Sequence, residues 1–292
     1  TLPLMVIFGF GFCVTAFIGY RGLELLSRIA VPAMIVLIAV SMFIATSDAG
    51  GLAGLTSITP TSDLSVAAAI TLVFGTFVSG GTQATNWTRF ARSGKTAVLA
   101  TLAAFFLGNG LMTLVGALGA LVYQQADIVD IMVAQGLATL GILMLFLNLW
   151  TTQDNTVYNF AVAGCNMLRT RRRKTITLVG ATIGTLLAVL GMYEWLIPFL
   201  VLLGTFIPPV GGVIMGNFFV RYRGEYPDIA SAKLPAFNIV GLSAYAIGSL
   251  VAYTSAWVAP LVGVLVAALS YALLETVVAG VKARRASAMG SV

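Results

Sequence analysis

LVFGTFVSGGTQATNW, residues 72–87, sets glycine, serine and threonine in the middle of an apolar segment that runs over residues 64–88. A helix needs about 20 apolar residues to cross the hydrocarbon of a bilayer, so this segment is long enough to span it. Paired glycines beside serine and threonine weaken a helix. A broken helix at that depth is tolerated only where it lines a cavity or is buried in protein. The stretch therefore predicts a membrane helix that is broken near residues 75–82.

The composition of the whole chain agrees with a membrane location. Of the 292 residues, 59% are hydrophobic and 9% are charged, whereas a soluble domain carries about 25% charged residues. The chain contains no histidine, which excludes histidine-based metal sites and the usual proton shuttle. The two cysteines, Cys13 and Cys165, lie far apart beside apolar stretches and indicate helix packing rather than a disulfide. We expect an all-α membrane protein.

Apolar windows of membrane-spanning length predict nine transmembrane helices. They cover roughly residues 2–20, 28–47, 64–88, 97–122, 137–163, 175–193, 195–219, 238–254 and 257–279. The connections between them are short and contain no linker rich in serine or proline, so residues 1–292 are expected to form a single transmembrane domain. Pro208 and Pro209 interrupt the seventh of these segments and predict either a hinge or a local packing feature.

The charged residues alternate between the two sides of the predicted helices. The basic residues occupy every second connection and the C-terminus: Arg21 and Arg28; Arg89, Arg92 and Lys95; Arg169 and 171–174; Arg221, Arg223 and Lys233; Lys282, Arg284 and Arg285. The intervening connections contain acids and no Lys or Arg: Asp48, Asp63, Asp127, Asp130 and Glu194. The positive-inside rule then predicts a cytoplasmic C-terminus. This topology explains the net charge of +6 better than a nucleic-acid partner does.

The predicted topology also bears on the start of the chain. Nine helices that end in the cytoplasm place Thr1 on the outer side, and no initiator methionine or signal peptide precedes it. An odd number of preceding helices would repair this topology. We therefore expect the chain to be incomplete at its N-terminus.

Two interpretations fit the polar residues of the third segment. A discontinuous helix would present backbone carbonyls and a positive N-terminal end to a ligand. Phe77 would then offer a flat face for stacking an aromatic solute. Alternatively, the glycine, serine and threonine residues form a seam where two helices pack closely. The residues alone leave both interpretations open.

A second polar stretch, LFLNLWTTQDNTVYNF, covers residues 145–160. Asn148, Thr151, Thr152 and Asn155 follow a spacing of i, i+3, i+4 and i+7, which puts them on one helix face. Uncharged oxygens of this kind suit Na⁺, because divalent ions normally bring carboxylates. Alternatively, both threonines bond back to carbonyls one turn earlier. Asp154 points away from this face and is expected to be either a buried structural group or a proton-coupling site.

Five stretches of the chain resemble one transporter family. FVSGGTQATNWTRFAR, AAFFLGN, ADIVDIMVAQGL, LNLWTTQDN and IPPVGGVI are similar, in order and spacing, to the purine and cytosine permease group of the nucleobase–cation symporters. The resemblance covers essentially the whole chain. It implies a leucine-transporter-like inverted-repeat fold of twelve helices, of which this chain matches helices 4–12. Residues 64–219 would then form the second inverted repeat. Independently of the resemblance, residues 126–136 form a short amphipathic stretch that is expected to lie on the outer side, over the cavity.

The same resemblance implies a function and a set of site residues. It implies a sodium-coupled symporter that imports cytosine across the bacterial inner membrane by alternating access, as a monomer in the lipid bilayer without a nucleic-acid partner. Thr76, Phe77, Ser79 and Asn148 would bind the substrate. The Asn148 carbonyl with the Thr151 and Thr152 hydroxyls would bind Na⁺ together with carbonyls of a first helix that has no counterpart here.

Other functions remain as alternatives to this interpretation. The same fold could carry hydantoin, allantoin, uracil or a purine, and the coupling ion could be H⁺. A polytopic membrane enzyme is disfavoured because the chain has no histidine, no HExxH helix and no membrane acid pair. The missing helices also allow a truncated remnant that does not transport.

Overall fold

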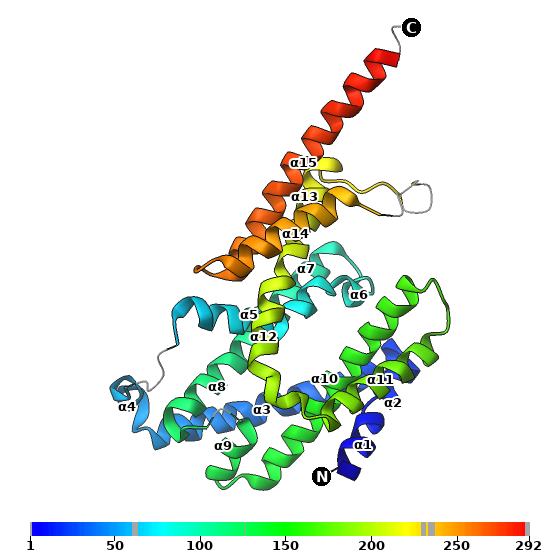
Figure 1. Ribbon diagram of the computed structural model, residues 1–292. Coiled ribbons are helices and arrows are strands. Elements are labelled where there is room, and N and C mark those ends of the chain that lie inside the picture. The colour runs from blue at the N-terminus through cyan, green and yellow to red at the C-terminus, as the bar shows by residue number, and fades with distance from the viewer. Residues whose placement is uncertain (1, 60–63, 126, 229–231, 233–236, 290–292) are drawn as a thin grey trace. The chain divides into compact units, whose positions relative to one another are not determined.

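The computed structural model describes residues 2–59, 64–125, 127–228, 232 and 237–289 (Figure 1). All regular elements among these residues are helical. Asp63 and Lys233, which carried part of the predicted charge alternation, lie outside the described residues. The side chains of Lys282, Arg284 and Arg285 also lie outside the description.

The chain divides into two compact units, which we describe separately. Unit one contains Thr1–Ser62 and Thr85–Glu194, and unit two contains Asp63–Ala84 and Trp195–Val292. The helices of unit one are α1 (Leu2–Gly11), α2 (Val14–Ile18), α3 (Tyr20–Asp48), α4 (Gly51–Ser57), α6 (Thr85–Thr88), α7 (Gly94–Ala103), α8 (Gly110–Tyr123), α9 (Ile128–Ala134), α10 (Ala138–Met167) and α11 (Arg173–Val189). Those of unit two are α5 (Val66–Thr82), α12 (Leu196–Phe206), α13 (Pro208–Gly216), α14 (Ile239–Thr254) and α15 (Ala259–Met289).

Shorter helical turns complete the two units. A π-helix, Ala104–Asn109, joins α7 to α8, and a second π-helix, Asn217–Arg221, follows α13. A 3₁₀ turn, Met192–Trp195, precedes α12. Together these turns make α7–α8 and α12–α13 into two long apolar segments, Gly94–Tyr123 and Met192–Arg221.

Within the described residues, five helices are long and apolar enough to cross a membrane. They are Arg21–Asp48, Val66–Thr88, Gly94–Tyr123, Met192–Arg221 and Ala259–Val281. Leu2–Ile18 and Ile239–Thr254 are apolar but shorter. Helices also occupy the ranges predicted for the fifth and sixth spans, as α10 and α11. The multi-pass all-α class is therefore confirmed, whereas the count of nine spans stays a prediction.

The core of unit one surrounds α10. One buried cluster joins it to α2, α3 and α11 and consists of Cys13, Ala16, Leu23, Val157, Tyr158 and Ala181. A second cluster joins it to α3, α8 and α9 and consists of Ile38, Val115, Met132 and Met144. Met132 docks α9 on this second cluster, and Ile131 packs against Gly119 of α8, with 0% and 1% of their surface exposed. The short helix α9 thus packs its apolar face against the rest of unit one.

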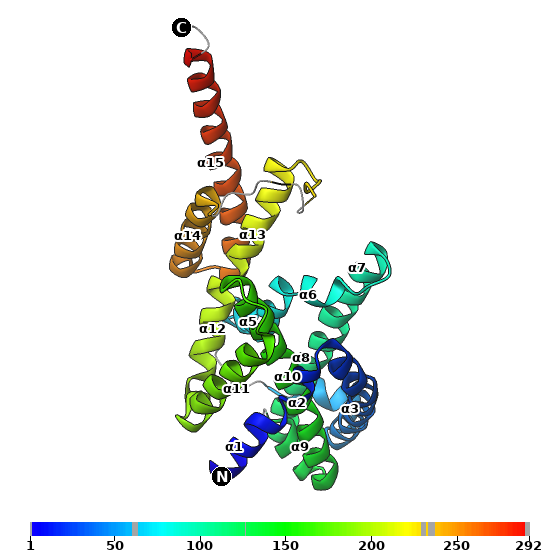
Figure 2. The same cartoon turned by 90° about the vertical axis from the view of Figure 1, so that its right-hand side faces the viewer.

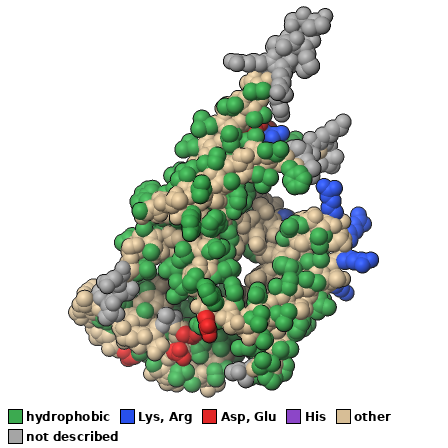
Figure 3. All heavy atoms as spheres, viewed as in Figure 1, with side chains coloured by type: hydrophobic (Ala, Val, Ile, Leu, Met, Phe, Trp, Pro, Cys, Tyr) green, Lys and Arg blue, Asp and Glu red, His purple; other side chains and the backbone are tan. Residues whose placement is uncertain are grey.

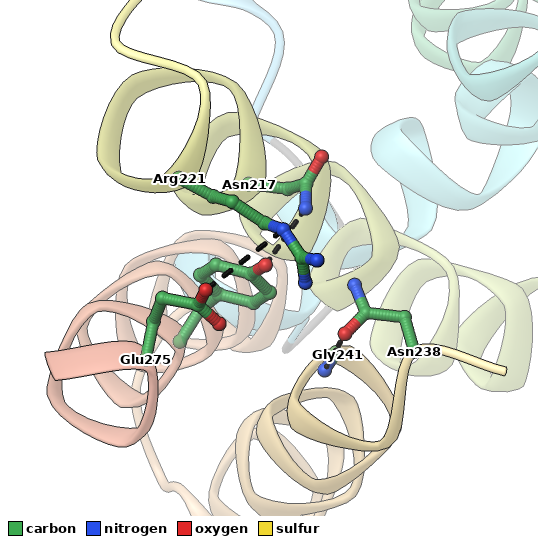
Figure 4. A network of polar contacts seen from close by, with 6 residues as sticks. Asn217, Arg221, Asn238, Gly241 and Glu275 are labelled. Atoms are coloured by element: carbon green, nitrogen blue, oxygen red, sulfur yellow. Dashed lines mark hydrogen bonds and ion pairs between the residues drawn. The ribbon is translucent and has the colours of Figure 1, made fainter. Parts of the chain in front are cut away.

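In unit two, α13, α14 and α15 lie side by side in both views (Figures 1 and 2). The buried Tyr271 of α15 packs on Gly216, and its hydroxyl accepts a hydrogen bond of 2.7 Å from Asn217 Nδ2. One turn further on, Arg221 Nε lies 3.9 Å from Glu275 Oε1 (Figure 4). This polar network fixes the end of α13 and its π-helix to α15.

The break in the predicted third span differs from the sequence-based expectation. α5 continues through residues 75–82, and the interruption falls at Gln83 and Ala84, before α6. Gln83 N donates to the Ser79 carbonyl at 3.2 Å, so the glycine pair remains inside the helical hydrogen-bond ladder. The interruption therefore lies directly after the range 75–82 near which the break was predicted. The two prolines, in contrast, do end a helix, because α12 stops at Phe206 and α13 begins at Pro208.

Glycines let α5 and α12 approach backbone to backbone. A Cβ atom on Gly75 would overlap the Leu200 carbonyl oxygen, and one on Gly204 would overlap the Thr71 carbonyl oxygen. Inside lipid no hydrophobic effect drives helices together, so their association relies on close van der Waals packing. Small residues at a helix crossing allow that packing. The packing-seam interpretation of this segment is thus correct for the Gly75 side of α5.

We expect Gly75→Ala to destabilise the protein by about 1–3 kcal/mol, because the added methyl group must push two backbones apart. Thermal unfolding in detergent, followed by tryptophan fluorescence, measures the effect. Gly211→Ala in α13 is the matched control, since a Cβ there meets nothing within 4 Å. Equal melting temperatures for the two variants would contradict the assigned contact.

Candidate functional site

The polar face of α10 forms one half of the predicted site. Thr151 is 9% exposed, and its hydroxyl donates to the carbonyls of Leu147 at 3.0 Å and Asn148 at 3.1 Å. Asn155 Nδ2 donates to the Thr151 carbonyl at 3.0 Å. Thr151 therefore follows the back-bonding alternative, as threonines in membrane helices often do. Its hydroxyl oxygen still has lone pairs that can face a cation.

Thr152 behaves differently from its neighbour. Its side chain is exposed, and within the described part of the chain its hydroxyl makes no hydrogen bond. Its carbonyl instead accepts the Thr156 hydroxyl at 2.9 Å. The Thr152 hydroxyl is thus not used to stabilise the helix. Both threonines and the Asn148 carbonyl lie within one turn of α10, which fits a cluster of uncharged oxygens for a hard cation.

The opposite face of α10 is anchored to the junction between α1 and α2. There the helix is interrupted at Phe12 and Cys13, and the Cys13 amide bonds to Phe10 instead of Gly9. The freed Gly9 carbonyl accepts hydrogen bonds from Gln153 Nε2 at 2.7 Å and Cys13 Sγ at 3.1 Å. These contacts fix the rotation of α10 about its axis. The face with Asn148, Thr151 and Thr152 is therefore turned away from the junction between α1 and α2.

Two further residues of α10 face the same junction. Trp150 Nε1 donates to the Thr15 hydroxyl at 3.1 Å. Asp154 is fully buried and faces the Thr15 hydroxyl and the Ala16 amide. Neither of these groups reaches hydrogen-bonding geometry with its carboxylate oxygens. The buried Asp154 thus lies on the helix face opposite Asn148, Thr151 and Thr152, as the helical period predicts.

The other half of the predicted site lies on α5. Thr76 is exposed, and its hydroxyl donates to the Val73 carbonyl at 2.7 Å. Phe77 is 39% exposed, and its ring lies over Gly80, where a Cβ would approach Cε1 to 3.0 Å. Ser79 is half-buried, and its carbonyl accepts the Thr82 hydroxyl at 2.9 Å. Gly80 therefore gives the aromatic ring the room that it occupies.

The structure places the two halves of the predicted site in different units. Thr76, Phe77 and Ser79 lie within four residues of one another in unit two. Asn148, Thr151 and Thr152 lie within one turn of each other in unit one. Each half is a local cluster on its own helix.

Sequence reasoning missed the contacts that bind α6 to α10. Asn86 Nδ2 donates to Asn159 Oδ1 at 3.0 Å, and Arg89 Nη2 donates to the Tyr158 hydroxyl at 3.0 Å. The sequence did contain a signal for these contacts. It was the pair of polar residues at 158–159, one turn beyond the predicted cation face. The short helix after the break thus belongs to the same unit as Asn148, Thr151 and Thr152, whereas α5 belongs to the other.

Comparison with known proteins identifies the family of this chain. Residues 1–283 match the family described as permease for cytosine/purines, uracil, thiamine, allantoin. The chain belongs to this permease family. Cytosine permeases of Escherichia coli strain K12 and O157:H7 are each 38% identical over 274 residues, which is 94% of this chain. The match covers 65% of the length of each of these relatives.

A solved structure agrees with the family in its fold. Mhp1, a nucleobase-cation-symport-1 family transporter in a closed conformation with bromovinylhydantoin bound, superimposes with a TM-score of 0.76 at 20% identity. The alignment covers 96% of this chain and 68% of Mhp1. The leucine-transporter-like fold expected for the permease family is thereby confirmed. Because the family consists of permeases, it also argues against the membrane-enzyme alternative.

Proposed function

We propose that this permease-family protein imports cytosine by coupling its entry to Na⁺ through alternating access. The observation that carries the proposal is the 38% identity to cytosine permeases over nearly the whole chain. The polar clusters on α5 and α10 support it, because each offers uncharged groups at the positions where the family resemblance implies substrate and ion.

We propose that the substrate contacts Thr76, Phe77 and Ser79 of α5 and the Asn148 side chain of α10. A neutral planar base would stack on the Phe77 ring, which is partly exposed over Gly80. Hydroxyl and amide groups would pair with the polar edge of the base. Such a combination of one aromatic face and a few polar groups is typical of small-molecule sites.

We further propose that the Asn148 carbonyl and the Thr151 and Thr152 hydroxyls bind Na⁺. The cation would favour the conformation that also binds the base. Each ligand would then increase the affinity for the other, because both select the same state. The proposal extends to residues 1–292 as a single transporter domain, with residues 64–219 as its second inverted repeat.

We propose that the protein lies in the bacterial inner membrane with a cytoplasmic C-terminus. The basic residues in alternate connections support this orientation. We propose that it functions as a monomer in the bilayer.

A second candidate keeps the fold and changes the substrate. The family description includes purines, uracil, thiamine and allantoin, and the Mhp1 structure holds a hydantoin. A related heterocycle is therefore the alternative to cytosine. H⁺ is the alternative to Na⁺.

Uptake of radiolabelled cytosine into cells that lack their own cytosine transporter tests the proposal. We expect uptake that requires Na⁺ and that excess unlabelled cytosine suppresses more strongly than uracil, allantoin, a purine or a hydantoin. Uptake that depends on pH but not on Na⁺ would show that H⁺ is the coupling ion. Stronger suppression by one of the competitors would show that this competitor is the preferred substrate.

A further inference from the structure

A run of basic residues joins α10 to α11. Residues 169–174 read RTRRRK, which gives five basic residues in six positions and no acid. α10 ends at Met167 and α11 begins at Arg173, so the run lies at the ends of two neighbouring helices. Its charge places it on the cytoplasmic side of the membrane.

Arg173 forms hydrogen bonds within the protein. Its guanidinium donates to the carbonyls of Ala16 at 3.3 Å and Phe17 at 3.1 Å, at the end of α2. It also lies over Gly19, where a Cβ would approach Nη1 to 3.0 Å. Gly19 has a φ of +98°, which favours glycine. Arg173 therefore holds the turn between α2 and α3 against α11.

The remaining four basic residues of the run form what we call the basic loop: Arg169, Arg171, Arg172 and Lys174. All four are exposed, and none forms an ion pair with any acid that the structure describes. Arg28, in contrast, bonds to Glu24 at 2.6 Å. Figure 3 shows Lys and Arg side chains projecting at the edge where α10 passes into α11. The basic loop thus carries positive charge that the protein itself does not neutralise.

The backbone of the loop is ordered around a strained arginine. Thr170 N donates to the Cys165 carbonyl at 3.0 Å and Arg169 N to the Asn166 carbonyl at 3.3 Å, which is the hydrogen-bond pattern of a Schellman motif. Arg169 occupies the left-handed position of this motif with a φ of 48°. Glycine is usual there because it has no Cβ, and a strained non-glycine residue commonly marks a functional site.

Apolar side chains lie directly beside the basic loop. Met167 is 84% exposed and Leu168 is 68% exposed. Apolar groups next to exposed arginines match the boundary of a bilayer, where hydrocarbon and phosphate groups are neighbours. This combination favours a lipid surface over a soluble anion.

We propose that the basic loop binds the phosphate groups of anionic phospholipids in the cytoplasmic leaflet. Clusters of basic residues next to a membrane helix attract anionic lipids. Guanidinium groups suit phosphate because they can donate two parallel hydrogen bonds. Met167 and Leu168 enter the adjoining hydrocarbon, so that the loop holds the cytoplasmic ends of α10 and α11 at the headgroup level.

Native mass spectrometry of the intact protein, released from nanodiscs of equimolar phosphatidylglycerol and phosphatidylcholine, tests the proposal. We expect the variant R169Q/R171Q/R172Q/K174Q to lose its preference for phosphatidylglycerol by about tenfold or more. A control is R92Q/K95Q, which removes two charges from another basic connection of unit one. The control should retain the wild-type preference. Equal preference in the four-site variant and the wild type would overturn the proposal.

Two further arms separate binding from folding and lipid from free anion. Arg169→Gly removes one charge and also relieves the left-handed strain, so we expect a weaker lipid preference with an unchanged or higher melting temperature. A lower melting temperature with an unchanged lipid preference would contradict the proposal. Inorganic phosphate at the same phosphate concentration should not displace the lipid. Displacement by phosphate would overturn the assignment to a lipid surface.

Discussion

Thr152→Ala should raise the Na⁺ concentration that half-activates uptake by about ten- to a hundredfold. The structure leaves the Thr152 hydroxyl without a partner among the described residues, so its removal takes nothing from the helix. A group that bonds to a charged partner contributes about 1.5–3 kcal/mol, which corresponds to this change in affinity. Measuring initial rates of cytosine uptake across a Na⁺ series gives the half-activating concentration.

The linked equilibrium adds a second expectation for the same variant. At low Na⁺ the KM for cytosine should rise as well, and high Na⁺ should restore it, because each ligand stabilises the state that binds the other. A merely structural defect would lower the maximal rate at every Na⁺ concentration.

The controls for this prediction lie in the same unit. Thr152→Ser keeps the hydroxyl and should keep the Na⁺ dependence close to that of the wild type. Thr182→Ala removes an exposed threonine of α11 that bonds back to Leu178 at 2.9 Å, and it should leave the Na⁺ dependence unchanged. An unaltered Na⁺ response in Thr152→Ala would remove this residue from the ion site.

Phe77→Ala should weaken cytosine binding by about ten- to a hundredfold. Stacking of a base on an aromatic side chain contributes about 1–3 kcal/mol. The ring is partly exposed on α5, so its loss should affect the ligand more than the fold. Isothermal titration of cytosine into the purified protein at saturating Na⁺ measures the dissociation constant.

Three variants locate the effect at the ring itself. Phe77→Trp retains an aromatic face and should bind cytosine better than Phe77→Ala. Gly80→Ala should also weaken binding, because its Cβ would approach the Phe77 ring to 3.0 Å and displace it. Phe199→Ala removes a phenylalanine of the same unit that is 40% exposed, against 39% for Phe77, and should have no effect. Wild-type affinity in Phe77→Ala would falsify the stacking assignment.

Local features of the candidate site were predictable from the sequence. The spacing of Asn148, Thr151 and Thr152 fixed their common face, because the helical period alone determines which side chains are neighbours. The same period put Asp154 on the other face, where the structure finds it buried. Whether each threonine hydroxyl bonds back to its own helix was not predictable. The two threonines differ in this respect, since Thr151 bonds back and Thr152 does not.

The position of the helix break shows the limit of this reasoning. Gly80 and Gly81 suggested that the helix breaks at this glycine pair, because glycine lowers helix propensity. In the structure Gly80 accommodates the Phe77 ring, and the helix continues to Thr82. Propensity is a weak signal that packing overrides.

By itself the sequence determined the class of protein and the positions of its long apolar segments, because the length and apolarity of a segment are local properties that a bilayer selects directly. Only the tertiary structure decided which residues of different helices contact one another. Asn86 and Asn159 are 73 residues apart, and Gln153 reaches a carbonyl 144 residues away. Contacts over such separations depend on how helices pack, which no local pattern specifies.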